Sequence, residues 1–197
     1  MASPAPARTG SLQPGDWIQA ALARLAQHGI QEVRVEVLAR DLGVSKGSFY
    51  WHFRDHAELL EEMLSSWERS EAHWLDSQAA DTTAATRWAK LIARATDPTR
   101  TRLEVALRAW ARMDKGVAVR LAAMERKRAS LVAEVLRDIG FAGSAAESWS
   151  EMVLLVCLGW TDRATRDAQF ALANRSLGEL LSEMILAASA RTSGLNR

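Results

Sequence analysis

The stretch that decides the fold is Gly43-Val44-Ser45-Lys46-Gly47-Ser48-Phe49-Tyr50-Trp51-His52-Phe53-Arg54-Asp55-His56. The preceding residues 35–42 are apolar at 35, 38, 39 and 42, which is the spacing of one helix face. Gly43 suits the left-handed position that ends a helix, and Ser45 suits the position that caps the next one. Two helices joined by a short turn with a glycine form a helix-turn-helix. The sequence predicts this motif, with its second helix over residues 46–51.

The two helices of the motif divide into buried and exposed residues. Ala39 is the small residue where steeply crossing helices approach, and Leu38, Leu42, Val44 and Phe49 are expected to pack around it. The exposed residues of the second helix are expected to be Lys46, Gly47, Ser48, Tyr50, Trp51 and His52. Lysine supplies a charge for phosphate, while serine, tyrosine and histidine supply hydrogen-bond donors for phosphates or base edges. Gly47 lets the backbone approach a groove wall. These residue types indicate a DNA-binding surface.

This motif, preceded by Leu-Ala-Arg-Asp-Leu at 38–42, resembles the DNA-binding domain of the TetR family of bacterial transcriptional regulators over residues 16–67. The rest of the chain is similar to the family only in its all-helical layout. The resemblance implies a homodimer that binds a near-palindromic operator on double-stranded DNA. It also implies release of the operator when a small molecule enters the C-terminal domain.

The resemblance carries over to individual residues. It places the recognition helix at 46–51, with Ser45 before it, Lys46, Ser48 and Tyr50 facing DNA, and His52 near the phosphates. The chain departs from the family at two further candidate DNA contacts. Arg34 replaces the usual serine or threonine cap and is expected to contact a phosphate directly. His56 replaces a phosphate-binding lysine, which would make binding more sensitive to pH.

Composition narrows the class of protein. The chain has 197 residues, 48% of them hydrophobic, which suffices for a small head and a larger body. Its net charge of +1 means that DNA affinity must come from the placement of charges rather than their excess. Cys157 is the single cysteine, which fits a reducing compartment. With no signal-peptide core and no run of about 20 apolar residues, a cytoplasmic protein without a membrane partner is expected.

The chain reads as an all-α protein of about nine helices. Residues 1–14 are expected to be a disordered arm, 15–56 a three-helix DNA-binding domain, and 57–197 a helical ligand-binding and dimerisation domain. In the first domain, Asp16 is expected to cap a helix over 17–28. Asp55 and Glu58 form a capping box for a long helix over 56–80 that belongs to both domains. The body helices are expected at 84–96, 100–113, 117–139, 144–164 and 174–190.

Two body helices carry more apolar residues than one chain of this size can bury. The helix from 144 onward leaves little polar face, and a helix that is apolar all round must be covered all round. A symmetric four-helix interface between two copies would cover it. The candidate interface residues are Trp149, Met152, Val153, Val156, Trp160, Leu177, Leu181, Met184 and Ile185.

Aromatic residues suggest a ligand site in the body. Trp67, Trp74, Trp88 and Trp110 fall on helices that surround the ligand cavity in the family. Met63 and Met113 would complete an apolar pocket, with Glu71, His73 or Arg108 orienting the ligand. The alternative is that these aromatics are simply core. The basic run at 126–128 is expected to be a solvated helix face, because consecutive residues point in different directions.

The expected function is that of a ligand-responsive transcriptional regulator, a repressor released by a small, largely apolar effector. An activator of the same architecture is an alternative, since the sign depends on where the operator lies. A different class, a helical binding protein or enzyme with a non-specific DNA-binding head, also stays open. The sequence has no phosphate-binding glycine loop, no Cys/His metal spacing and no nucleophile motif. We therefore expect no catalytic residue, no metal and no cofactor.

Overall fold

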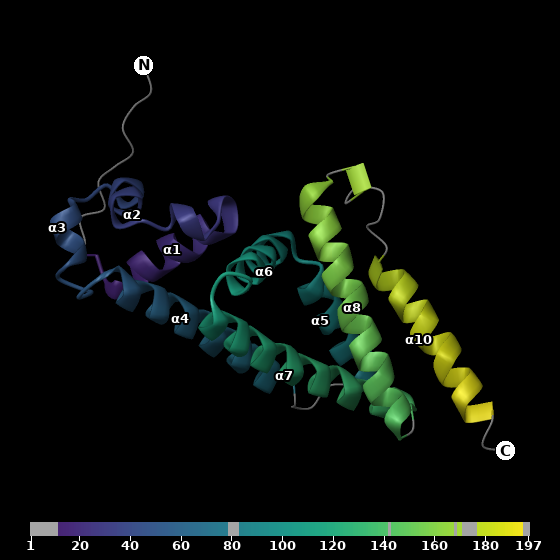
Figure 1. Ribbon diagram of the computed structural model, residues 1–197. Coiled ribbons are helices and arrows are strands. Elements are labelled where there is room, and N and C mark those ends of the chain that lie inside the picture. Colours follow the sequence, from purple (N-terminus) through teal and green to yellow (C-terminus); the bar gives the residue numbers. More distant parts are fainter. Residues whose placement is uncertain (1–11, 79–82, 142, 168, 171–176, 195–197) are drawn as a thin grey trace. The chain divides into compact units, whose positions relative to one another are not determined.

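The computed structural model describes residues 12–78, 83–141, 143–167, 169–170 and 177–194 (Figure 1). These residues form nine α-helices, one 3-10 helix and no strand, which confirms the predicted all-α class. The chain divides into two compact units, Met1–Arg69 (unit 1) and Ser70–Arg197 (unit 2). The division falls inside a long helix, whereas the expected domain boundary stood at that helix's start. Residues 1–11 of the expected arm lie outside the described residues.

Unit 1 contains the elements around the decisive stretch. They are α1 (Pro14–His28), η1 (Ile30–Glu32), α2 (Val35–Leu42), α3 (Lys46–Phe49) and the first part of α4 (His56–Ser77). Helix α1 contacts η1 and α2, and α2 contacts α3. These contacts hold the two helices of the motif on a third.

The starts of helices α1 and α4 differ in detail from the prediction. Helix α1 begins at Pro14, where a missing N–H costs nothing, so Asp16 lies in the first turn and accepts a 2.8 Å hydrogen bond from the Gln13 amide. At the start of α4, the Glu58 amide donates to Asp55 Oδ1 at 2.8 Å, as expected of a cap. The Glu58 carboxylate accepts from the Arg54 amide at 2.6 Å, one residue further back than a capping box requires.

Unit 2 is a helical body. Its helices are α5 (Ala84–Ala95), α6 (Pro98–Ala111), α7 (Lys115–Ile139), α8 (Ser144–Arg166) and α10 (Leu177–Gly194), together with the end of α4. Helix α7 contacts α5, α6 and α8. Helix α10 contacts α5.

Local chemistry shifts three boundaries in unit 2. Helix α6 begins at Pro98 because the Asp97 carboxylate accepts from the Arg100 amide at 2.7 Å. It ends at Ala111, before Met113. Helix α7 begins at Lys115 rather than at 117, because Asp114 accepts hydrogen bonds from the Gly116 and Val117 amides. Both shifted helix starts have an aspartate at the cap.

Helices α5 and α10 approach closely at a glycine. A Cβ atom on Gly178 would lie 2.5 Å from Cγ2 of Ile92, which is too close for any side chain. Nearby, the Trp88 indole N–H donates to Ser182 Oγ at 2.9 Å. Gly178 is therefore required for α10 to pack on α5.

Candidate functional site

The turn of the helix-turn-helix follows the sequence prediction in its backbone. Gly43 ends α2 in the left-handed conformation, with φ 71° and ψ 30°. Phe49 is fully buried, and its ring lies 5.3 Å from the Trp17 ring and 5.2 Å from the Phe53 ring. Leu38 and Ala39 are also buried, as expected. The aromatic cluster therefore fixes α3 on α1.

The packing and length of the motif differ from expectation in two respects. Leu42 and Val44 are only half-buried. Helix α3 ends at Phe49, so Tyr50 and Trp51 lie just beyond its last turn rather than within it. A helix of this length relies on the aromatic cluster for its position rather than on its own hydrogen bonds.

The predicted DNA-facing residues lie together on the outside of unit 1. Tyr50 is 56% exposed and Trp51 is 87% exposed. Lys46 and Gly47 are exposed, while Ser48 and His52 are half-buried. We call this set, Lys46, Gly47, Ser48, Tyr50, Trp51 and His52, the α3 face.

The amine of Lys46 has a partner within the chain. It forms an ion pair with the Glu36 carboxylate of α2, and both side chains are more than half exposed. The pair raises the pKa of the Lys46 amine, and it lowers the pKa of Glu36, in both cases first through the hydrogen bond between them. Lys46 must leave Glu36, or share with it, to reach a phosphate.

Three other predicted DNA contacts have specific local positions. Ser45 occupies the cap position of α3, but its hydroxyl makes no capping hydrogen bond, which corrects the expected cap. Arg34 precedes α2, and its guanidinium lies 3.1 Å from the Glu32 carboxylate. The His56 Nε2 atom lies 2.6 Å from the Val33 carbonyl oxygen, which ties the start of α4 to the segment before α2.

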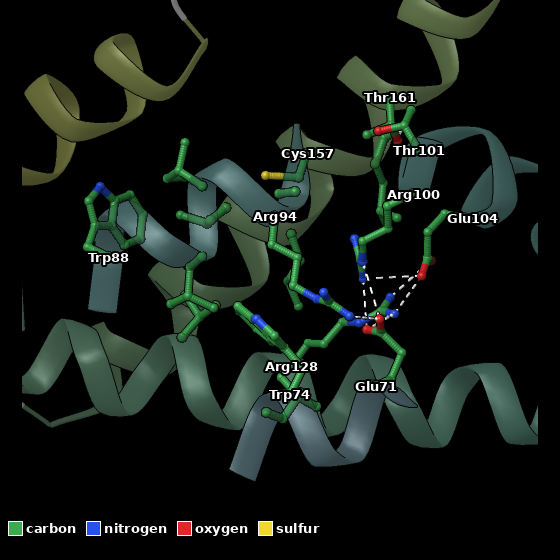
Figure 2. Close-up of a pocket in the computed structure, with 18 of the residues that line it drawn as sticks. Glu71, Trp74, Trp88, Arg94, Arg100, Thr101, Glu104, Arg128, Cys157 and Thr161 are labelled. Atoms are coloured by element: carbon green, nitrogen blue, oxygen red, sulfur yellow. Dashed lines mark hydrogen bonds and ion pairs between the residues drawn. The ribbon is translucent and has the colours of Figure 1, made fainter. Parts of the chain in front are cut away.

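Unit 2 contains a cavity of about 80 Å³ between its helices (Figure 2). Its polar lining residues are Glu71, Arg94, Arg100, Thr101, Glu104, Arg108, Arg128 and Thr161. Its apolar lining includes Trp74, Leu75, Trp88, Leu91, Ile92, Val132, Val153, Leu154 and Cys157. In Figure 2, Trp88 lies at one end of the cavity and Glu104 at the other. The cavity therefore has an apolar end and a charged end.

The charged end is built on the carboxylate of Glu71, which is 3% exposed. Glu71 Oε2 lies 2.9 Å from Arg100 Nη2 and 2.7 Å from Arg128 Nη2, and Oε1 is hydrogen-bonded to Arg94. The Arg94 guanidinium also stacks over the Trp74 ring, 4.4 Å from its centroid. Figure 2 shows these arginines converging on Glu71 from three helices, α5, α6 and α7.

A second buried carboxylate completes the cluster. Glu104 is 3% exposed and accepts from Arg128 at 2.6 and 3.0 Å. It lies 3.2 Å from Arg100 and 3.6 Å from Arg108. Arg108 also donates to Thr161 Oγ1 at 3.1 Å. We call the two glutamates with Arg94, Arg100, Arg108 and Arg128 the ionic cluster.

The ionic cluster sets the protonation of its carboxylates. Burial alone raises the pKa of Glu71, but the hydrogen bonds and charges of Arg100 and Arg128 outweigh it and hold the pKa at about 2. Burial likewise opposes ionisation of Glu104, and Arg128 and Arg100 outweigh it, so that pKa is also lowered. Both glutamates are therefore ionised at neutral pH.

The cavity brings together half of the predicted ligand-binding residues. Glu71, Trp74, Trp88 and Arg108 line it. The other candidates do not: Met63 and Trp67 belong to unit 1, Trp110 is buried in α6, and Met113 is 63% exposed beyond the end of α6. His73 does not line it either.

Sequence reasoning missed most of the ionic cluster. Arg128 was expected on a solvated face with Arg126 and Lys127, but it lines the cavity while the other two are exposed. Glu104 lies four residues after Arg100 and four before Arg108, and this spacing on one helix face was the available signal.

The candidate interface residues of α8 and α10 fall into three groups, which are buried, half-buried and exposed. Val153 lines the cavity, and Leu181 and Ile185 are buried within the single chain. Trp149, Trp160 and Leu177 are half-buried. The exposed apolar residues on these two helices are Met152, Leu155, Val156, Leu180, Met184 and Leu186. We call these six the apolar face of α8 and α10.

Two kinds of site are absent from the described part of the chain. It holds no group of three or more His, Cys, Asp or Glu side chains placed to bind a metal ion. None of its helices has the length and apolar character needed to cross a membrane.

Comparison with known proteins bears on unit 1. The family model described as "Bacterial regulatory proteins, tetR family" matches residues 18–63. The HTH-type transcriptional regulator AcrR of Shigella flexneri is 34% identical over 56 residues, which make up 28% of this chain. The match spans only 25% of the length of that relative.

Comparison with solved structures extends over both units. A transcriptional regulator from Rhodococcus sp. Rha1 has a TM-score of 0.71 at 19% identity, over 92% of this chain and 97% of that one. A putative transcriptional regulator from Saccharomonospora viridis, solved with choline, has a TM-score of 0.68 at 13% identity, over 87% and 92% of the two chains. At these identities the likeness shows the fold alone, over 92% and 87% of this chain.

Proposed function

Because the chain belongs to the TetR family of bacterial regulatory proteins, we propose that it is a ligand-responsive transcriptional repressor. It binds a palindromic operator as a homodimer and leaves the operator when a small effector enters the cavity of unit 2. Its site of action is the bacterial cytoplasm, where the DNA lies. No catalytic role is assigned to any residue.

The observation that carries this proposal is the α3 face. A charged amine, two hydroxyls and an imidazole stand on one outer surface, and the buried ring of Phe49 holds them in place. Lys46 neutralises a phosphate, and Tyr50 and Ser48 donate to phosphates or base edges. In a dimer, two such faces would enter major grooves about 34–36 Å apart.

Helix α4 supports a route from ligand to DNA. His56, at its start, is bonded to the Val33 carbonyl, and Glu71, in its second half, is bonded to three arginines of the ionic cluster. The two residues are fifteen positions apart in the sequence of α4. A ligand that binds the two positions of α4 unequally would change the affinity for the operator.

The apolar face of α8 and α10 supports a dimer. Six large apolar side chains are exposed on two helices of one chain, and pairing these helices with a second copy would bury them. Leu155, 66% exposed, is the first residue to change. Light scattering after gel filtration should report a dimer for the natural chain and a monomer for Leu155→Glu. A monomeric natural chain would refute the dimer.

The experiment that tests the function is selection of genomic DNA fragments by the purified protein at two salt concentrations. One palindromic site retained at the higher salt is expected. Lys46→Ala should weaken binding to that site and reduce the slope of log affinity against log salt by about 0.9. Tyr50→Phe should weaken binding and leave the slope unchanged. Recovery of random fragments only, all lost at the higher salt, would overturn the proposal.

A further inference from the structure

The charged end of the cavity holds more positive than negative charge. Among the lining residues, four arginines face two glutamates. A guanidinium carries about five N–H donors and a carboxylate accepts about four hydrogen bonds, so the donors greatly outnumber the acceptors. Both carboxylates are already bound by arginines, which leaves little for a cationic ligand to contact.

Arg108 is the member of the ionic cluster that the carboxylates hold least. Arg94, Arg100 and Arg128 each hydrogen-bond Glu71, whereas the nearest approach of Arg108 to Glu104 is 3.6 Å. The one hydrogen bond that its guanidinium donates within the described part of the chain goes to the Thr161 hydroxyl. Its side chain is 20% exposed, so it is shielded from bulk water.

Other acids near Arg108 do not cancel this excess. The charges of Glu125 and Asp162 also act on Arg108, but neither residue lines the cavity. Both are partly exposed to solvent, and Asp162 pairs with Arg166 at 2.7 Å. Their charges are therefore screened more strongly than those inside.

A second polar group in the lining also needs a partner. Thr101 lines the cavity at 4% exposed, and its buried hydroxyl has no hydrogen-bond partner among the residues that the structure describes. A buried hydroxyl left in this way costs about 1–3 kcal/mol, which a polar ligand group would remove. The Arg94 Nε–H is likewise buried and has no hydrogen-bond partner among the described residues.

The opposite end of the cavity is apolar. Trp88 lies there, away from Glu104 (Figure 2), and the apolar lining of the cavity also includes Leu91, Ile92, Val132, Val153 and Leu154. Sites for drug-sized ligands measure about 300–1,000 Å³, whereas this cavity measures about 80 Å³. A small ligand with one apolar end and one polar end fits this lining.

We propose, on the basis of the regulator function above, that the effector is a small organic anion whose charged group binds Arg108 and whose apolar body lies towards Trp88. This specifies the charge of the largely apolar effector expected from the sequence. Arg100 touches both Glu71 and Glu104, at 2.9 and 3.2 Å, so an anion beside Arg108 also competes with Glu71 for Arg100. Such competition loosens the anchor of α4, which links the anion to the DNA response.

The test compares acids with neutral amides of the same skeleton. Isothermal titration calorimetry on the full chain would use butyrate against butyramide, and isobutyrate against isobutyramide, which are small because the cavity measures about 80 Å³. We expect each acid to bind at least about tenfold more tightly than its amide, the factor given by one charge-assisted hydrogen bond. Arg108→Gln should lose this preference, and Arg108→Lys should keep part of it, because lysine keeps the charge without the bidentate geometry. Arg112→Gln, an exposed arginine at the end of the same helix, should bind as the natural chain does.

Equal affinity for acid and amide would overturn the inference, as would failure of both acids to bind, or an unchanged preference in Arg108→Gln. Circular dichroism checks that Arg108→Gln is folded. If it is not, the Arg108→Lys result and the acid-to-amide ratio of the natural chain decide. The DNA selection fails or succeeds independently, so preference for acids without specific DNA binding would refute only the regulator function.

Discussion

The ion pair of Lys46 with Glu36 beside the α3 face and the ion pairs of the ionic cluster differ in burial. The Lys46 and Glu36 side chains are 51% and 61% exposed, while those of Arg128 and Glu71 are 12% and 5% exposed. An exposed ion pair contributes about 0.2–1 kcal/mol to stability, whereas removing one partner of a buried pair costs about 3–5 kcal/mol. The DNA surface can therefore change without unfolding the chain. In the cavity, ligand chemistry and stability depend on the same residues.

The largest effect is expected for Arg128→Met. This change removes the arginine that binds both buried carboxylates, so unfolding free energy should fall by about 3–5 kcal/mol. Urea unfolding followed by circular dichroism measures it, with Lys127→Met, the exposed neighbour, as control. Comparable stability of the two variants would contradict the distinction between buried and exposed charges.

Acid should destabilise the body through Glu71. Its pKa is lowered in the folded chain from 4.5 to about 2, so its contribution is complete above pH 4.5 and is lost as the pH falls towards 2. This contribution is about 3 kcal/mol. Urea unfolding at pH 7, 4.5 and 3 should show the loss in the natural chain and a weaker loss in Glu71→Gln. Glu36→Gln, the exposed counterpart in unit 1, should lose as much unfolding free energy between pH 7 and pH 3 as the natural chain does. A smaller loss in this variant would contradict the assignment of the acid sensitivity to Glu71.

A glycine in each unit gives a smaller contrast. Gly178→Ala would force the new methyl against Ile92 and should cost about 1–3 kcal/mol. Gly15→Ala in α1 meets nothing within 4 Å and should stabilise by up to about 1 kcal/mol. Thermal unfolding of both variants measures the two signs. Stabilisation by Gly178→Ala would show that α10 does not need its close approach to α5.

The smallest effect is expected for Glu36→Gln on operator binding. Loss of this carboxylate frees the Lys46 amine and removes a negative charge beside the α3 face. Affinity for the selected site should rise slightly, measured by fluorescence anisotropy at low salt, because exposed charges are strongly screened. Glu147→Gln removes an exposed partner of Arg137 in unit 2 and should leave affinity unchanged. Weaker binding by Glu36→Gln would mean that Glu36 positions Lys46 for DNA.

The same two regions differ in how far the sequence predicts them. The turn at Gly43 depends on neighbours within a few residues, and its backbone was predicted correctly. Helices α5, α7 and α8 were also predicted within a few residues, because their apolar periodicity and caps are local. Helix α3 came out shorter because tertiary packing of Phe49, rather than helix propensity, sets its length.

The cavity depends on partners that are distant in the sequence. Arg128 and Glu71 are 57 positions apart, and Arg100 and Glu71 are 29 apart. Arg128 stands in a basic run that predicts exposure, and only the packing of α7 buries it. Met113 was predicted to line the pocket from a helix over 100–113, but α6 ends at Ala111. Long-range pairing of this kind leaves no local pattern in a single sequence.

The unequal roles within the ionic cluster have an evolutionary consequence. Arg94, Arg100 and Arg128 hold Glu71 in place, and mutations at these positions would be removed by selection for folding. Arg108 contributes little to this anchoring, because Glu104 also pairs with Arg100 and Arg128. Descendants of this chain can therefore drift at position 108 and acquire a preference for neutral inducers while retaining the same scaffold and operator.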